Sequence, residues 1–329
     1  MSELHKFLFD GLPVRGMMVR LTDAWQDILQ RRASNTETGA YPAPVRELLG
    51  EMAAAAVLLQ SNIKFNGALV LQIFGDGPVK VAVAEVHSNL ALRATASVQG
   101  HVSAGDTLAD LVNVQGQGRC AITLDPQDRL PGQQPYQGVV PLNDAQGSGS
   151  LGSLAQVLQQ YMHQSEQLDT TLVLAANDQV AAGLLIQRMP TKGVDNLAGA
   201  TESEADARDA LGENEDYRRI AALAASLTRD ELLALDVDTV LRRLFWEEKL
   251  LRFVPQEGES GPHFACTCSR ERVQSMLRSL GREEVQSVVA ERGSVEVGCD
   301  YCGAQYSFDP VDVAQLFTDA SHPAPGAMQ

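Results

Sequence analysis

Four of the five cysteines of this chain lie close together near its C-terminal end. They form two short pairs separated by a longer stretch, with members Cys266, Cys268, Cys299 and Cys302. Zinc takes four tetrahedral ligands, and two close cysteine pairs that fold back on one another are typical of a structural Cys₄ zinc site. We therefore expect this cysteine cluster to bind one Zn²⁺ per chain when its thiols are reduced.

The two halves of the cysteine cluster differ in how strongly they indicate zinc. The Cys299-x-x-Cys302-Gly303 half is a strong signal, whereas Cys266-x-Cys268 is less usual because most structural sites space their ligands by two to four residues. A thioredoxin-type site is disfavoured because no βαβ setting surrounds the pair. A catalytic zinc is disfavoured because four thiolates leave no open position. His263 could replace one ligand, although a lone histidine in a Gly-Pro loop is more simply explained as exposed.

The residues around the pairs have the pattern of a small module at about 260–310. The stretch 269–293 predicts two short helices that are separated at Gly281 and end at Gly293. Alternating apolar residues then predict one strand entering the second cysteine pair and another leaving it. Such a small module has little core of its own.

Two roles for the metal remain open at this point. Zinc contributes on the order of 10–16 kcal/mol to the folding of small modules of this kind. Thiolates are also the form of cysteine that oxidants attack, and their oxidation would remove that contribution. The site could therefore be a structural staple or a redox switch.

Residues 1–190 predict one domain with antiparallel strands and packed helices. Helical periodicity covers 41–60 and roughly 151–166, and the strand pattern covers 67–75, 79–86, 90–98, 119–125, 170–176 and 180–188. Strands that follow one another through short turns, such as GDGP at 75–78, favour antiparallel pairing over βαβ units.

The alternation within these strands predicts which side chains share a face of the sheet. One face of 67–75 carries Leu69, Leu71 and Ile73, and one face of 79–86 carries Val79, Val81 and Val83. Cys120 alternates in phase with Ile122 and Leu124, so we expect a buried, inert thiol at that position.

The chain changes character after Pro190. Residues 195–219 are acidic and poor in large apolar side chains, which is typical of a tether or a weakly stabilised helix. Helical periodicity returns from Tyr217 to Leu227, Thr228 and Glu231 have the spacing of a capping box, and residues 236–253 also have a helical pattern.

The sequence as a whole predicts an α+β fold in three parts. These are a core domain at 1–190 with a mainly antiparallel sheet, an acidic and helical linker at 191–235, and a C-terminal zinc-binding domain at 236–329.

Composition narrows the choice of partner and compartment. The net charge of −16 disfavours nucleic acid and anionic membranes, because binding to both depends on basic residues. No apolar run is long enough to span a bilayer, and the N-terminal residues lack the pattern of a secretion signal. We expect a cytoplasmic protein without nucleic-acid or membrane partners.

Several longer motifs resemble one known family. LFWEEKLLRFVP (244–255), FACTCSRERVQSMLRSLG (264–281) and VEVGCDYCGAQYSF (295–308) are similar to the C-terminal signature of the redox-regulated heat-shock chaperones, the heat shock protein 33 or 33 kDa chaperonin family. IKFNGALVLQIFGDGPV (63–79), YMHQSEQLDTTL (161–172) and AAGLLIQRMP (181–190) are similar to its N-terminal domain. The four cysteines match without departure.

The resemblance implies a holdase chaperone of the stress response that is inactive while reduced and zinc-bound. On oxidation it implies disulfides Cys266–Cys268 and Cys299–Cys302, loss of zinc and unfolding of the C-terminal module and linker. It further implies a homodimer that holds unfolded client proteins without ATP. The client-contacting residues stay unknown, with the N-terminal sheet and the helix from Tyr217 to Leu227 as alternatives.

Two other function classes remain as rivals. A constitutive zinc-ribbon adaptor for protein or nucleic acid would need a basic face, for which the candidates are Arg270, Arg272, Arg278 and Arg282. Nearby glutamates offset these arginines. An enzyme is the weaker rival, because the chain carries no nucleophile–base signature or phosphate loop; we expect no catalytic residues.

Overall fold

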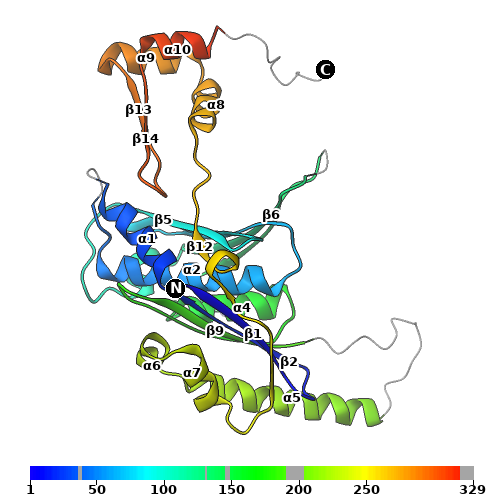
Figure 1. Cartoon of the computed structure of the whole chain (residues 1–329). Helices are drawn as coiled ribbons and strands as arrows, with labels where there is room; N and C mark the ends of the chain where they lie inside the picture. The colour runs from blue at the N-terminus through cyan, green and yellow to red at the C-terminus, as the bar shows by residue number, and fades with distance from the viewer. Residues whose placement is uncertain (36–38, 130–131, 145–148, 190–203, 319–329) are drawn as a thin grey trace.

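The computed structural model describes residues 1–35, 39–129, 132–144, 149–189 and 204–318, with the backbone alone for 204–214. The described parts are stacked in layers (Figure 1). A small module stands on one side of two stacked sheets, a long helix lies between the sheets, and three further helices cover the opposite side. The fold is α+β with antiparallel sheets, as the sequence predicts.

The first sheet has the strand order β10-β1-β2-β9-β8, with β11 also paired to β1. All these pairings are antiparallel. The bounds are β1 Glu3–Phe9, β2 Val14–Leu21, β8 Thr170–Ala176, β9 Ala181–Arg188, β10 Leu250–Arg252 and β11 Gln256–Glu257. This sheet therefore joins the start of the chain to residues just before the cysteine cluster.

The second sheet has the order β12-β5-β4-β3-β6-β7. Its bounds are β3 Gly67–Phe74, β4 Val79–His87, β5 Ala91–Val98, β6 Arg119–Pro126, β7 Tyr136–Pro141 and β12 His263–Phe264. β12 runs parallel to β5, and the other pairs are antiparallel. The strands and the turn at 75–78 that the sequence predicts are confirmed.

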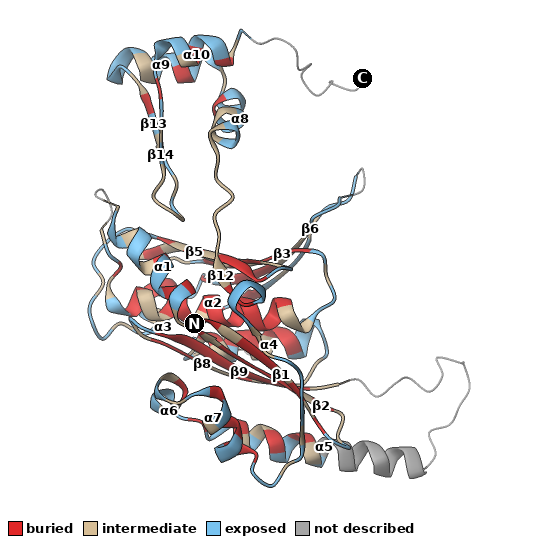
Figure 2. Cartoon of the chain, viewed as in Figure 1, coloured by how far each residue is buried: buried red, intermediate tan, exposed pale blue. Residues whose placement is uncertain are grey.

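Helix α2 (Ala43–Asn62) lies between the two sheets and contacts strands of both. It is buried around most of its circumference, because Ala53 to Ala56 are small enough to let both sheets approach (Figure 2). The remaining helices around this core are α1 Asp23–Ala33, α3 Leu108–Val112 and α4 Leu154–Ser165. The helices predicted at 41–60 and 151–166 correspond to α2 and α4.

The structure differs from the sequence prediction in three respects: the buried face of β4, several elements that were not predicted, and residues 236–253. In β4 the buried face carries Ala82, Ala84 and Val86, while Val81 and Val83 are only half-buried. The pairing with β5 shifts register between Val79 and Val81, and this irregularity reverses the alternation that the sequence predicts. Strands β1 and β2 and helix α1 were not predicted.

The third difference concerns residues 236–253, for which a helix was predicted throughout. Helix α7 (Val237–Leu244) confirms the first half, but the second half contains strand β10. Pairing of β10 with β1 accounts for this outcome, since local periodicity carries no information about a partner at the start of the chain.

Helices α5 (Glu204–Ala225), α6 (Arg229–Ala234) and α7 lie against the outer face of the first sheet. The predicted capping box is present, with Thr228 and Glu231 exchanging hydrogen bonds at the start of α6. The acidic segment 195–219 lies partly outside the described residues, and its later part belongs to α5. No helix in the described ranges is both long and apolar enough to cross a membrane.

The small C-terminal module contains α8 Arg270–Leu280, α9 Arg282–Arg292, β13 Val295–Gly298, β14 Gln305–Phe308 and α10 Pro310–Leu316. The two helices separated at Gly281 and ended at Gly293 are confirmed, as are both strands. Its buried apolar side chains are Leu277, Val285, Val295, Phe308, Val313 and Leu316. Such a short set gives the module a small core.

Glu51 on α2 provides a pH-dependent test of the core. Burial raises the pKa of Glu51 from 4.5 to about 7, with the charge of Arg229 opposing this rise and that of Glu47 adding to it. The folded state therefore keeps a proton that the unfolded state loses between these values. The contribution of Glu51 to stability is fully present below pH 4.5 and is lost as the pH rises through 7.

We expect Glu51→Gln to raise the melting temperature at pH 8 and to leave it nearly unchanged at pH 4.5. Thermal unfolding followed by circular dichroism at both pH values measures this. Glu47→Gln is the control: its loss of the half-exposed ion pair with Arg229 at 3.1 Å and its relief of the repulsion toward Glu51 oppose one another, so it should change the melting temperature little at pH 8. Equal effects of Glu51→Gln at the two pH values would contradict the prediction.

Candidate metal centre and the covered apolar face

The four cysteines of the cluster converge on one point between β12 and the β13–β14 hairpin. Their sulfur atoms all lie within 4.8 Å of one another. Cys266 Sγ lies 3.7 Å from Cys299 Sγ, and Cys268 Sγ lies 3.3 Å from Cys302 Sγ. Of the His, Cys, Asp and Glu side chains in the described ranges, this group alone is close enough together to hold a metal ion.

Local backbone structure explains how each pair is held. Strand β12 leads into the first pair, and Ser269 caps helix α8 directly after Cys268 by accepting a hydrogen bond from the Arg272 N–H. The second pair occupies the turn between β13 and β14. There the Gly303 N–H donates to the Cys299 carbonyl at 2.8 Å, and Gly303 has a φ of +72°, a conformation that favours glycine.

Tyr306 adds a polar contact that the sequence does not reveal. Its hydroxyl donates a hydrogen bond to Cys268 Sγ at 3.2 Å from the neighbouring strand β14. Although desolvation works to raise it, the pKa of Cys268 is lowered to about 7 by this bond and by those of the other thiols. Tyr306 lies on the strand that leaves the second pair, and its hydroxyl reaches Cys268 in the first pair because the chain folds back there.

In the second pair burial outweighs the opposing hydrogen bonds and raises the pKa values of Cys299 and Cys302. A metal binds the thiolate form of cysteine, so binding at these two residues must be accompanied by loss of protons. The cluster can therefore hold a soft metal ion with a pH-dependent affinity.

The arginines considered as a basic face are each hydrogen-bonded within the module. Arg270 pairs with Asp312 at 2.9 Å and lies over the Phe308 ring. Arg272 donates to Thr267, while Arg278 and Arg282 donate to carbonyl oxygens of the last turn around α10. Their charges thus hold α8, α9 and α10 together.

His263 and Cys120 lie apart from the cysteine cluster. His263 is half-buried in β12 rather than exposed in a loop, and its Nδ1 hydrogen-bonds the Gly261 carbonyl. Cys120 is fully buried on β6 within the main core, and burial raises its pKa to about 12. The prediction of a buried Cys120 is confirmed.

A second feature lies on the opposite side of the molecule, where α5, α6 and α7 cover an apolar face. Strands β1, β2, β8 and β9 supply this outer face, whose buried apolar members are Phe7, Phe9, Val14, Met18, Ala175, Val180, Ala182, Leu184 and Ile186. Helices α5, α6 and α7 and the residues next to them cover this face with Tyr217, Ile220, Ala224, Leu227, Leu232, Val237, Val240, Leu241, Leu244 and Phe245. The predicted apolar stripe from Tyr217 to Leu227 is thus buried against the sheet.

Two arginines fasten α6 to the core. The Arg20 guanidinium on β2 donates to the carbonyl oxygens of Leu232, Leu233 and Leu235 at the end of this helix. At its other end, Arg229 donates to the Ala176 carbonyl and forms the ion pair with Glu47.

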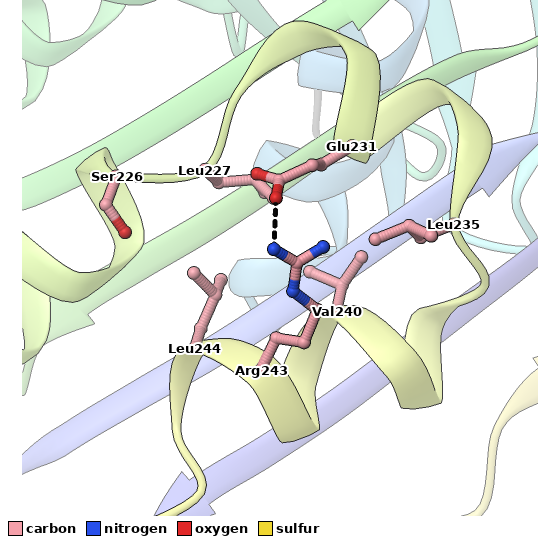
Figure 3. Close-up of a pocket in the computed structure, with 7 residues that line it drawn as sticks. All are labelled: Ser226, Leu227, Glu231, Leu235, Val240, Arg243 and Leu244. Atoms are coloured by element: carbon pink, nitrogen blue, oxygen red, sulfur yellow. Dashed lines mark ion pairs between the residues drawn. The ribbon is translucent and has the colours of Figure 1, made fainter.

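A hollow lies at the surface between the three helices that cover the apolar face. A cavity of about 160 Å³ lies between the end of α5, α6 and α7, with the ion pair of Glu231 and Arg243 at its side (Figure 3). Apolar side chains such as Val240 and Leu244 line it. Ser226 and Arg243 also line it and are exposed, so the cavity is open to solvent.

Comparison with known proteins identifies the family. The family model described as "Hsp33 protein" matches residues 2–309. The chain belongs to the Hsp33 family. A 33 kDa chaperonin of Chromobacterium violaceum is 44% identical over 96% of this chain and 94% of its own length, and one of Methylobacillus flagellatus is 42% identical over 96% and 94%. A 33 kDa chaperonin of Shewanella woodyi is 38% identical over 98% of each chain.

The crystal structure of the 33 kDa chaperonin (Hsp33) of Thermotoga maritima shares the fold. It aligns with a TM-score of 0.69 at 21% identity and covers 96% of this chain and 97% of that one. Membership of the Hsp33 family supports a chaperone function for this chain, and the cysteine cluster fits metal binding.

Proposed function

We propose that this Hsp33 family member is a redox-regulated holdase whose metal is Zn²⁺. The observation that carries the proposal is the convergence of four thiol groups in a module with a small core. A tetrahedron of sulfurs around zinc, with Zn–S distances of roughly 2.3 Å, has edges of roughly 3.8 Å. The Sγ–Sγ separations of 3.7 Å between Cys266 and Cys299 and of 3.3 Å between Cys268 and Cys302 fit such a shell.

Bound zinc would keep the four sulfurs deprotonated and hold the two halves of the module together. The chain itself supplies the redox chemistry. Two thiolates give two electrons to one peroxide molecule and form one S–S bond, and with two protons the peroxide yields two water molecules. Two such reactions consume all four thiolates, after which the cluster can no longer hold its ion.

We propose the pairings Cys266–Cys268 and Cys299–Cys302, which the family resemblance implies. In the reduced structure each of Cys266 and Cys268 also lies close to a sulfur of the other pair, so the pairing is a prediction separate from the metal site. Peptide mapping of the oxidised protein distinguishes it from the cross-paired alternative, Cys266–Cys299 with Cys268–Cys302.

The covered apolar face is the client-binding surface in this proposal. Unfolding of the module would remove the anchor at β12, and release of the linker would then expose the outer face of the first sheet to unfolding client proteins. Detachment of α5, α6 and α7 would uncover the buried apolar side chains of β1, β2, β8 and β9, and a large exposed apolar patch is typical of a protein-binding surface. We propose that the active form is a cytoplasmic homodimer that turns over no substrate as an enzyme.

Oxidation with hydrogen peroxide at raised temperature tests the proposal. We expect release of one zinc ion per chain, loss of four free thiols and suppression of aggregation of a thermally unfolding client, all reversed by a thiol reductant. Protein kept reduced at the same temperature is the control. Zinc release without any effect on client aggregation would overturn the holdase assignment.

A constitutive zinc-ribbon adaptor is the second candidate, and no observation favours it over the holdase. Its basic face would require arginines whose guanidinium groups instead bind within the module. A salt-sensitive gel shift by the reduced protein would support the adaptor.

A further inference from the structure

One arginine of the second sheet contacts both halves of the candidate metal centre. Arg93 lies on β5, and its Nη1 donates to Thr267 Oγ1 at 3.0 Å. Thr267 is the residue between Cys266 and Cys268. The same guanidinium lies 4.3 Å from the ring centroid of Tyr301, which is located between Cys299 and Cys302.

Arg93 is itself held firmly by the core. Its Nη2 donates to Glu85 Oε2 on β4 at 2.7 Å, and the two side chains are only 16% and 12% exposed. Burial works to lower the pKa of Arg93, but the hydrogen bond and charge of Glu85, followed by Tyr301 and Cys266, raise it above its usual value. The guanidinium therefore stays charged between an acidic anchor and the cysteine cluster.

The surrounding contacts place this arginine at the junction of module and core. The N–H groups of His263 and Ala265 donate to the Leu90 and Leu92 carbonyls, which pairs β12 with β5. Thr95 Oγ1 donates to the Asp300 carbonyl at 3.0 Å, two strand positions from Arg93. The module thus meets the second sheet along β5, at the inter-cysteine residues.

We propose that Arg93 is a positioning residue that couples the metal centre to the core. Each half of the cluster contributes one contact to the same guanidinium, so both contacts are made together only while the two halves are held together. The charge of Arg93 also offsets the net charge of −2 that four thiolates would give a Zn²⁺ site. Metal retention and docking of β12 on β5 are thereby linked through one side chain.

The inference rests on the proposed metal site and extends it to a residue outside the cysteine motif. Arg93, rather than β12 alone, is the point where loss of the metal is transmitted to the core. The two-residue pairing of β12 is short, and side-chain contacts must supplement it.

Arg93→Met tests the coupling in the full-length reduced protein. We expect the variant to bind one zinc ion at saturation. Its zinc affinity, measured by competition with a chromophoric chelator, should be about 10- to 100-fold weaker than that of the unmodified chain. Hydrogen exchange should accelerate at His263 and Ala265, while the β13–β14 hairpin stays protected in zinc-saturated protein. Arg119→Met is the matched control, since Arg119 is exposed on β6 of the same sheet.

Two further variants separate coupling from a general loss of stability. Arg93→Met with Glu85→Gln also removes the carboxylate that has lost its arginine and keeps only His87 as a partner, and it should restore the melting temperature without restoring zinc retention. Arg93→Lys keeps the charge beside Glu85 but cannot contact both halves, so it should also retain zinc poorly. Unchanged zinc affinity and exchange in Arg93→Met, or equal loss of protection throughout the module, would overturn the coupling. Absence of zinc binding by the unmodified chain would instead refute the proposed metal.

Discussion

Replacing Ile220 by aspartate is expected to produce a chain that suppresses client aggregation while still reduced and metal-loaded. Ile220 lies on α5 and is fully buried against the outer face of the first sheet. A carboxylate there would be placed against apolar side chains with no partner, a change that costs several kcal/mol. The linker should therefore detach, although the cysteine cluster on the opposite side is untouched.

Three measurements on the reduced Ile220→Asp protein test this expectation. Aggregation of a thermally unfolding client should be suppressed without oxidant, an apolar dye should bind, and zinc content should stay at one ion per chain. Ala222→Asp is the matched control, because Ala222 is exposed on the same helix and should leave the linker docked. A detached linker without chaperone activity would show that the covered face is not the client-binding surface.

The elements that could be predicted from the sequence are those whose pattern is local. Strands β3 to β6, helices α2 and α4, the capping box at Thr228 and both helices of the module follow from periodicity and from turn residues. The cysteine cluster follows from ligand spacing. These features need no knowledge of where distant segments meet.

Features that depend on long-range pairing could not be predicted in this way. Strand β10 has a helical pattern but pairs with β1 at the other end of the chain. The contact of Arg93 with Thr267 and Tyr301 joins residues far apart in sequence, and nothing in the local sequence around Arg93 indicates a metal centre. The irregular register of β4 reversed a predicted face for the same reason.

The arrangement of the layers places the cysteine cluster and the covered apolar face on opposite sides of the two sheets (Figure 1). The chain between them crosses from the first sheet to the second through β10, β11 and β12. These strands are three, two and two residues long. A connection held by so few backbone hydrogen bonds depends on anchors at both ends, namely the linker packing and the docked module.

Cys299→Ser is expected to have the largest effect on the module. A hydroxyl is a poor ligand for a soft metal, so the variant should lose zinc and the roughly 10–16 kcal/mol that structural zinc contributes to folding in such modules. The six buried apolar side chains of the module cannot by themselves offset the entropy of ordering it. Hydrogen exchange should rise throughout α9, β13, β14 and α10, and zinc analysis should find less than one ion per chain.

Cys120→Ala provides the control, because Cys120 is buried in the main core and lies outside the cysteine cluster. This variant should keep its zinc and the protected amides of the module while losing some core stability. Protection of α2 and the central strands should persist in Cys299→Ser, since their packing does not involve the module. If the zinc-free module kept its protection, its packing alone would be sufficient to fold it, and loss of the metal could not release the anchor at β12.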